Sequence, residues 1–296
     1  MDTWTQAMRR GDFGSAWTIS DNVLLERIGR GDICTHLPRH EQFVWNGEPL
    51  TGRRIFVRCY HGLGDTLQFV RLLAHPRLRA AEITLWVQPA LIRLLQTVHG
   101  IDRILPLHEG NPGLDYDVDI EIMELPHALR LAVDELPGPM PYIYVPASAT
   151  RAAASRRRRI GVCWSAGEWD PKRSLSAAEL RYWGQLNDVR WFSLQFPPAT
   201  CALPAAPIAC NDIAEMAARM QLLDLIITVD TMTAHLAGAL GLPVWLLLPH
   251  DADWRWMLGR DDTPWYPTMR LFRQPMAGDW STVIEQVHDE LAHRVH

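Results

Sequence analysis

The sequence has few of the features that mark secreted or membrane proteins. Its five cysteines are odd in number and lack C-x-x-C spacing, which indicates neither a disulfide framework nor a zinc site. No apolar run approaches the roughly 20 residues of a membrane span. The opening residues MDTWTQAMRRGDF lack the apolar core of a signal peptide. We therefore expect a cytoplasmic protein with no membrane span.

The charge balance argues against binding to nucleic acid or to membrane surfaces. The net charge of −5 gives no overall attraction to nucleic acid or to an anionic membrane, so we expect no nucleic-acid partner. Hydrophobic residues make up 48% and charged residues 21% of the chain, as in a packed globular protein. At 296 residues the chain is long enough for two domains of ordinary size.

The most informative stretch is residues 224–249. Two apolar runs, 225–229 and 244–248, predict parallel strands covered on both faces. Between them a small-residue helix, 232–240, ends at Gly241. The strand end and helix start carry Asp230, Thr231, Met232, Thr233 and His235. Free N–H groups at a helix start suit a phosphate. The alternative is that Asp230 and Thr231 only cap the helix and that His235 is a core histidine.

The first half of the chain contains a related turn. A strand, 54–60, runs into His61, Gly62, Gly64 and Asp65, and a helix is predicted at 67–73. The glycines permit a tight turn and close approach of a ligand, although the full G-x-G-x-x-G fingerprint is absent. The alternatives are a simple turn with Asp65 as N-cap and a surface histidine at His61.

Further elements continue a β-α-β-α series, which predicts a parallel sheet. We expect strands at 82–88, near 104 and at 118–122, with helices from Pro89 and over 126–133. A segment rich in Pro, Ala and Ser, 136–155, followed by the arginines 156–159, is interpreted as a solvated linker rather than a nucleic-acid patch.

A second αβ series starts at residue 160. Its strand, 160–164, leads to a loop with Lys172 and Arg173, a helix capped by Ser176 and Glu179, and a strand at 191–195 that ends at Gln195. This second series is completed by a helix from 212, a strand at 269–272 and a helix at 279–293. The predicted class is α/β, with a helical appendage at 1–40 and two Rossmann-like domains at 41–150 and 151–296.

Several segments match a known family. They are WNGEPLTG (45–52), HGLGDTLQF (61–69), SLQ (193–195), VDTMTAHLAGALG (229–241), DWRW (253–256) and DTPWYPTMRLFRQ (262–274). Together they resemble the heptosyltransferase-type glycosyltransferases of the GT-B fold, and among them the bacterial branch that carries tetratricopeptide repeats ahead of the transferase. The likeness covers the chain from about residue 40. The first 30 residues resemble the remnant of a repeat array.

The resemblance implies two domains facing a cleft, with the last helix crossing back to the first domain. It implies inverting transfer of a sugar from a nucleotide-diphosphate sugar to the hydroxyl of a glycan, lipid, protein or small molecule, without a metal. Asp65 matches the general base, and the acceptor side includes His61, Gly62 and Gly64. The donor side includes Lys172, Arg173, Gln195, Asp230, Thr231, Met232, Thr233 and His235. Met232 replaces the family's usual glycine, and His61 replaces the branch's usual glutamine.

The chemistry of such a transfer fits these residue types. Negative charge that builds on the leaving diphosphate can be stabilised by helix N–H groups, threonine hydroxyls and Lys172 or Arg173. A carboxylate such as Asp65 can accept the proton of the acceptor hydroxyl. Two alternatives remain: a non-catalytic nucleotide-sugar or protein-binding module, and a sugar-nucleotide epimerase or hydrolase. A dinucleotide oxidoreductase is disfavoured, and His250, Asp251 and Asp253 lack the spacing of a metal site.

Overall fold

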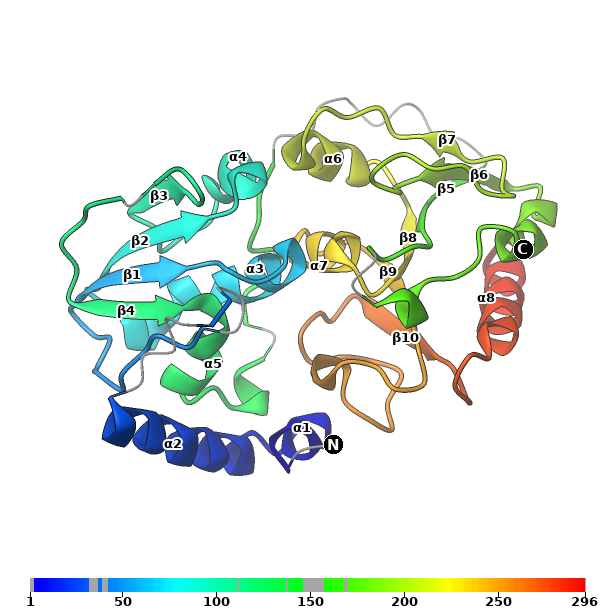
Figure 1. Ribbon diagram of the computed structural model, residues 1–296. Helices are drawn as coiled ribbons and strands as arrows, with labels where there is room; N and C mark the ends of the chain where they lie inside the picture. The colour runs from blue at the N-terminus through cyan, green and yellow to red at the C-terminus, as the bar shows by residue number, and fades with distance from the viewer. Residues whose placement is uncertain are drawn as a thin grey trace. The chain divides into compact units, whose positions relative to one another are not determined.

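The computed structural model describes residues 3–31, 37–38, 42–110, 112–136, 138–145, 157–167 and 170–295. The chain divides into two compact units, Met1–Tyr144 and Val145–His296. Each unit contains a parallel sheet with helices (Figure 1). The expected class, α/β with parallel sheets, is confirmed. The domain boundaries expected at 40–41 and 150–151 lie outside the described residues.

The sheet of the first unit has four parallel strands in the order β3-β2-β1-β4. They are β1 (Arg54–Arg58), β2 (Glu82–Val87), β3 (Arg103–Pro106) and β4 (Val118–Glu121). Val57 pairs in register with Leu85 and Ile120, and all three side chains are fully buried. One face of this sheet therefore lies in the apolar core.

The helices of the first unit are short. They are α3 (Leu63–Phe69), continued by a 3-10 turn at Val70–Ala74, α4 (Ile92–Leu95) and α5 (Leu125–Ala128). Helix α3 starts earlier than the expected 67–73, because Gly62 is its N-cap; Asp65 therefore lies inside the first turn and is not the N-cap. The helix expected over 126–133 stops early, and Arg130 takes a positive φ of 50°.

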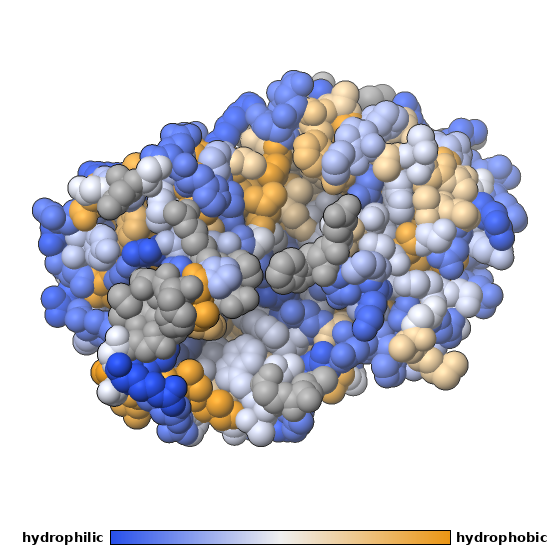
Figure 2. All heavy atoms as spheres, in the orientation of Figure 1, coloured by the Kyte–Doolittle hydropathy of each residue, from blue (hydrophilic) through white to orange (hydrophobic). Residues whose placement is uncertain are grey.

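The N-terminal helices are α1 (Thr3–Arg9) and α2 (Phe13–Arg30). Asp12 caps α2 by accepting a hydrogen bond from the N–H of Ser15. The indole N–H of Trp17 donates to the carbonyl of Leu131 at 2.7 Å, which ties α2 to the rest of the first unit. The outer side of α2 exposes hydrophobic side chains, seen as orange atoms over this helix in Figure 2. They are Val23, Leu25 and Ile28.

The sheet of the second unit has six parallel strands in the order β10-β9-β8-β5-β6-β7. They are β5 (Arg158–Cys163), β6 (Val189–Ser193), β7 (Ala206–Pro207), β8 (Leu225–Val229), β9 (Val244–Leu248) and β10 (Met269–Arg273). Numbered from β5, this is the order 3-2-1-4-5-6 of a doubly wound sheet. Every residue of β8 and β9 is buried, as their apolar runs predict. Arg158 and Arg159 belong to β5, which corrects their assignment to the linker.

The helices of the second unit are α6 (Ile213–Met220), α7 (Met232–Ala239) and α8 (Trp280–Val295). The helix expected after Ser176 is a 3-10 helix, Glu179–Gln185, although Glu179 does accept the N–H of Ser176. Helix α8 buries its apolar side in the core of this unit, where Trp183 donates to the carbonyl of Ile284. The expected crossing of the last helix to the first domain stays a prediction. Within the described residues, none of the helices has the length and apolarity that a bilayer crossing requires.

Candidate functional site

Each sheet contains one point where the strand order reverses. In open parallel sheets, ligands bind beyond the carboxyl ends of the strands at such a switch point. In the second unit it lies between β5 and β8, and in the first unit between β1 and β4. The turn at Asp230 follows β8, and the turn that leads to Asp65 follows β1. Topology thus brings the two predicted clusters to the positions where each unit would hold a ligand.

The first turn of α7 is the candidate site for an anion, and residues 231–234 together with Arg173 are called the anion cradle below. Thr231 is the N-cap, and its hydroxyl accepts the N–H of Thr233 at 3.2 Å. The N–H of Ala234 donates to the carbonyl of Thr231 at 3.0 Å, and the helix dipole adds partial positive charge at this end of α7. Met232, at the first helical position, is half-buried, and Thr233 is buried. Met232 thus occupies the helical position at which the resemblance implied a glycine.

Arg173 adds a full positive charge to the cradle. Its Nη1 donates to the carbonyl of Asp230 at 3.1 Å, immediately before Thr231. Its Nε is buried and has no hydrogen-bond partner among the described residues, and the nearest carboxylate oxygen, from Asp170, is 3.7 Å away. Lys172 is exposed beside it. Of the two predicted cations, the structure therefore brings Arg173 to the cradle.

Asp230 and His235 flank the cradle in the sequence, and both side chains are buried at 2% exposure. Oδ2 of Asp230 accepts the indole N–H of Trp256, and Oδ1 lies 3.8 Å from Nε2 of His235. The imidazole stacks on Trp256 and its Nδ1 is hydrogen-bonded to the Tyr266 hydroxyl at 2.9 Å. Burial raises the pKa of Asp230 to about 6, against the opposing charge of Arg255. These side chains position the start of α7 from inside the core.

Gln195 holds the loop after β5 through hydrogen bonds of its side-chain amide. It follows β6, and its Oε1 accepts the N–H groups of Trp164 and Ser165 at 3.3 and 3.1 Å. Its Nε2 donates to the carbonyl of Ser165 at 3.0 Å. The amide therefore fixes the loop after β5, on the other side of the switch point from Thr231.

In the first unit, Asp65 lies in the first turn of α3 and is half-buried. Its Oδ2 accepts the N–H of Gly62 at 3.0 Å. A Cβ atom on residue 62 would lie 3.1 Å from this oxygen, so a glycine suits the position. Gly64 lies in the same turn. The turn thus holds the carboxylate in a defined orientation at the switch point.

Glu121, the last residue of β4, is a neighbour that the sequence interpretation missed. It is 1% exposed, and its two oxygens accept the N–H groups of Tyr60 and Met123 at 3.2 and 2.6 Å. Nε2 of His61 lies 3.5 Å from Oε2 of Glu121. Burial raises the pKa of Glu121 well above its usual range, and the charges of Glu124 and Asp65 raise it further.

His61 is therefore not only a surface residue of the turn, since a buried carboxylate stands beside its ring. Its carbonyl also accepts the side-chain N–H of Gln88 at 2.7 Å. A signal for Glu121 was available in the sequence, because this acidic residue lies at the carboxyl end of the strand expected at 118–122, at the same edge of the sheet as Asp65.

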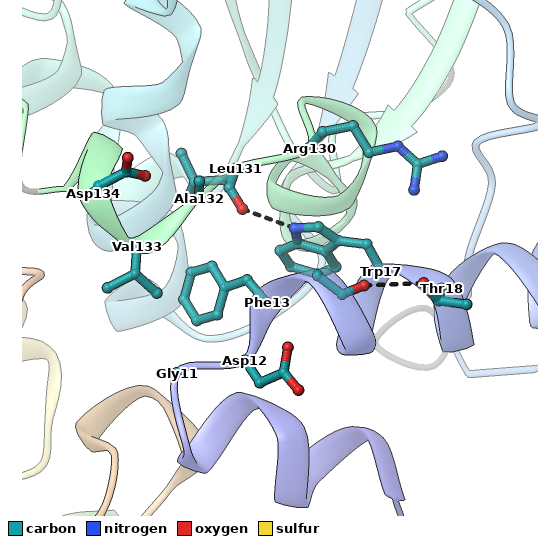
Figure 3. A pocket seen from close by; sticks show the side chains of 11 residues that line it. Gly11, Asp12, Phe13, Trp17, Thr18, Arg130, Leu131, Ala132, Val133 and Asp134 are labelled. Carbon is teal, nitrogen blue, oxygen red and sulfur yellow. Dashed lines mark hydrogen bonds between the residues drawn. The ribbon is translucent and has the colours of Figure 1, made fainter.

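A separate cavity of about 710 Å³ lies between α2 and the segment after α5. Figure 3 shows Phe13 and Trp17 of α2 directed toward Leu131, Ala132 and Val133. This cavity is away from the strand ends of the switch point and includes none of the predicted site residues.

In the described part of the chain, no three His, Cys, Asp or Glu side chains are grouped so that they could hold a metal ion. Nδ1 of His250 lies 3.2 Å from the carbonyl of Gln274, and Asp253 caps the 3-10 helix Trp254–Trp256. The four cysteines within the described ranges are free thiols.

Comparison with known proteins places these observations in context. No protein-family model matches the chain. Protein FlbA of Caulobacter vibrioides is 24% identical over 285 residues, which covers 82% of this chain and 47% of that protein. The chain thus spans about half the length of this curated relative.

Solved structures share the fold at low sequence identity. ADP-heptose LPS heptosyltransferase II of E. coli has a TM-score of 0.55 and 14% identity, covering 82% of this chain and 98% of that one. The dodecameric, iron-containing heptosyltransferase TibC of enterotoxigenic E. coli, in complex with ADP-D-β-D-heptose, has a TM-score of 0.60 and 11% identity, covering 84% and 78%. The described residues offer no ligand group that fits such an iron.

Proposed function

We propose that this chain is an inverting glycosyltransferase that moves a sugar from a nucleoside-diphosphate sugar to an acceptor hydroxyl without a metal. The observation that carries the proposal is the anion cradle at the switch point of the second sheet. The likeness of the fold to heptosyltransferases supports it, although a fold alone does not fix a reaction.

The cradle holds the leaving diphosphate in this proposal. As the bond between the anomeric carbon and the diphosphate oxygen breaks, both electrons stay with that oxygen. Its new charge is stabilised by the N–H groups of α7 and by Arg173. Asp230, His235 and Gln195 act as positioning residues, because their polar atoms are engaged inside the unit.

Asp65 is proposed as the general base. It takes the proton of the acceptor hydroxyl, whose oxygen attacks the anomeric carbon opposite the leaving group and inverts its configuration. We assign residues 41–150 to the acceptor and 151–296 to the donor, with 1–40 as a helical appendage of the tetratricopeptide-repeat-associated branch. The free cysteines favour a cytoplasmic location.

Donor binding is tested by thermal shift with ADP, UDP, GDP and CDP. A nucleoside diphosphate held only by the folded chain raises the melting temperature by a few degrees at saturation. Arg173→Gln is expected to remove most of this shift. Arg181→Gln, which changes an exposed arginine of the same unit, is expected to keep it. Stabilisation by none of the four nucleotides would contradict the proposal.

Turnover is tested with Asp65→Asn. Loss of the base is expected to lower transfer or donor hydrolysis by about 10²-fold or more, while the thermal shift with the nucleotide stays unchanged. Asp134→Asn, which alters an exposed carboxylate of the same unit, is the matched control. The alternative, a non-catalytic binding module, is favoured by the structural bond that Asp65 makes to Gly62. Equal turnover in wild type and Asp65→Asn would exclude Asp65 as the base.

A further inference from the structure

A second cavity of about 710 Å³ lies in the first unit, beside β1 and β2. Successive residues of a strand point to opposite faces of the sheet. Val57 is buried on one face, while Phe56 and Arg58 point to the other, where Arg58 is in register with Trp86 of β2. Phe56, Arg58 and Trp86 line this cavity, which we call the second-face cavity, together with Tyr60 and Tyr116.

Aromatic rings form one wall of the second-face cavity. The ring of Phe56 stacks on Trp86 with centroids 5.5 Å apart and on Tyr116 with centroids 5.1 Å apart. Tyr60 meets Trp86 edge to face at 5.9 Å. Tyr116 is 41% exposed, so part of this wall is open to a ligand. The wall offers the flat, apolar surface against which a ring-shaped ligand stacks.

On the polar side of the cavity, the charge of Arg58 is compensated by an ion pair with Asp119. Nε of Arg58 donates to Oδ1 of Asp119 at 2.6 Å, and Nη2 donates to Oδ2 of the same carboxylate. Nη1 donates to the hydroxyl of Tyr60 at 2.5 Å. A guanidinium has five N–H groups, so two of those on Arg58 stay available to donate. Arg58 is the only arginine or lysine among the described lining residues, and Asp119 balances its charge.

We propose that the second-face cavity binds a neutral saccharide ring, and that this ring is part of the acceptor. The apolar C–H face of a pyranose packs on the aromatic wall, while its hydroxyls accept hydrogen bonds from Arg58. The guanidinium of Arg58 is already paired with Asp119, so it would not compensate the charge of an anionic ligand, and burying that charge would be unfavourable. The assignment of this ring to the acceptor rests on the glycosyltransferase proposal, whereas binding of the ring does not.

The test is saturation-transfer NMR on the full chain with the methyl glycosides of glucose, galactose, mannose and N-acetylglucosamine at millimolar concentration. At least one glycoside is expected to receive saturation. Tyr116→Ala is expected to weaken its binding about threefold to tenfold, the effect of losing one stacked ring. Tyr116→Phe retains the ring and is expected to keep the affinity near that of the wild type.

The matched control is Tyr144→Ala, which removes an exposed tyrosine of the same unit that does not line the cavity. It is expected to leave binding unchanged. The proposal is overturned if no glycoside receives saturation, or if Tyr116→Ala and Tyr144→Ala act alike. It is also overturned if glucose 6-phosphate or adenosine displaces the glycosides with higher affinity, because the cavity would then prefer an anion or a nucleobase.

Failure of this inference is distinguishable from failure of the proposed function. Nucleoside diphosphates are added to the same samples, and their thermal shift reports the cradle independently. A chain that binds a neutral glycoside through Tyr116 but is stabilised by no nucleotide would retain the saccharide site and lose the transferase proposal.

Discussion

The indole Nε1 of Trp256 donates a hydrogen bond of 2.9 Å to Oδ2 of Asp230, and both side chains are buried. This bond connects the 3-10 helix Trp254–Trp256 to the turn that starts α7. Burial of the carboxylate disfavours its charged form and raises the pKa of Asp230 to about 6. The charge of Arg255 and the hydrogen bond from Trp256 oppose this rise.

Asp230 is expected to make folding stability depend on pH. The pKa of its carboxyl is about 3.8 when unfolded and about 6 when folded, so between these values the folded state binds the additional proton. The stability contribution is therefore fully present below about pH 3.8 and is lost as pH rises through about 6. A shift of this size corresponds to roughly 3 kcal/mol.

The measurement is urea unfolding of wild type and Asp230→Asn from pH 4 to 7. The asparagine keeps an acceptor for Trp256 but does not titrate, so the difference between the two stability curves isolates Asp230 from Glu124, whose pKa burial raises to about 7. Parallel curves for the two proteins would contradict this assignment.

Gly238→Ala is expected to disturb the cradle from within α7. A Cβ atom at residue 238 would lie 2.4 Å from Cδ1 of Tyr266, so the ring must move. Overpacking of this kind costs about 1–3 kcal/mol. Movement of Tyr266 would also weaken its hydrogen bond to His235.

Chemical unfolding and the nucleotide thermal shift measure the two effects of this substitution. Gly167→Ala is the control, because a Cβ atom there meets nothing within 4 Å. If Gly238→Ala were as stable as Gly167→Ala, the close packing of Tyr266 against α7 would be disproved.

Gln195→Ala is expected to loosen the loop after β5. Removal of the amide leaves the N–H groups of Trp164 and Ser165 without this acceptor, at a cost of about 1–3 kcal/mol. Hydrogen exchange at these two amides should become faster, and the nucleotide thermal shift should decrease. Gln185→Ala, which removes an exposed glutamine of the same unit, should change neither quantity. Unchanged exchange at Ser165 in Gln195→Ala would show that the Gln195 amide does not hold this loop.

The strand–helix–strand segment β8-α7-β9 shows how much the local sequence can predict. Continuous apolar runs give both strands, and Thr231 and Gly241 bound the helix, because strand burial and helix capping depend on adjacent residues. The same reasoning was less accurate for Glu179–Gln185, which is a 3-10 helix despite its capping residues. It also misplaced the start of α3, because a glycine N-cap supplies no side-chain signal.

The amino-acid sequence by itself determined the strands other than β7, the small-residue turns that follow them and the residue types gathered there. Only the tertiary structure decided how these residues act, because their partners are distant in the chain. Trp256 and Tyr266 bury Asp230 and His235, and Glu121 stands beside His61. Burial and hydrogen bonding depend on which segments the parallel sheets bring together, and that is a property of the packed chain rather than of any local pattern.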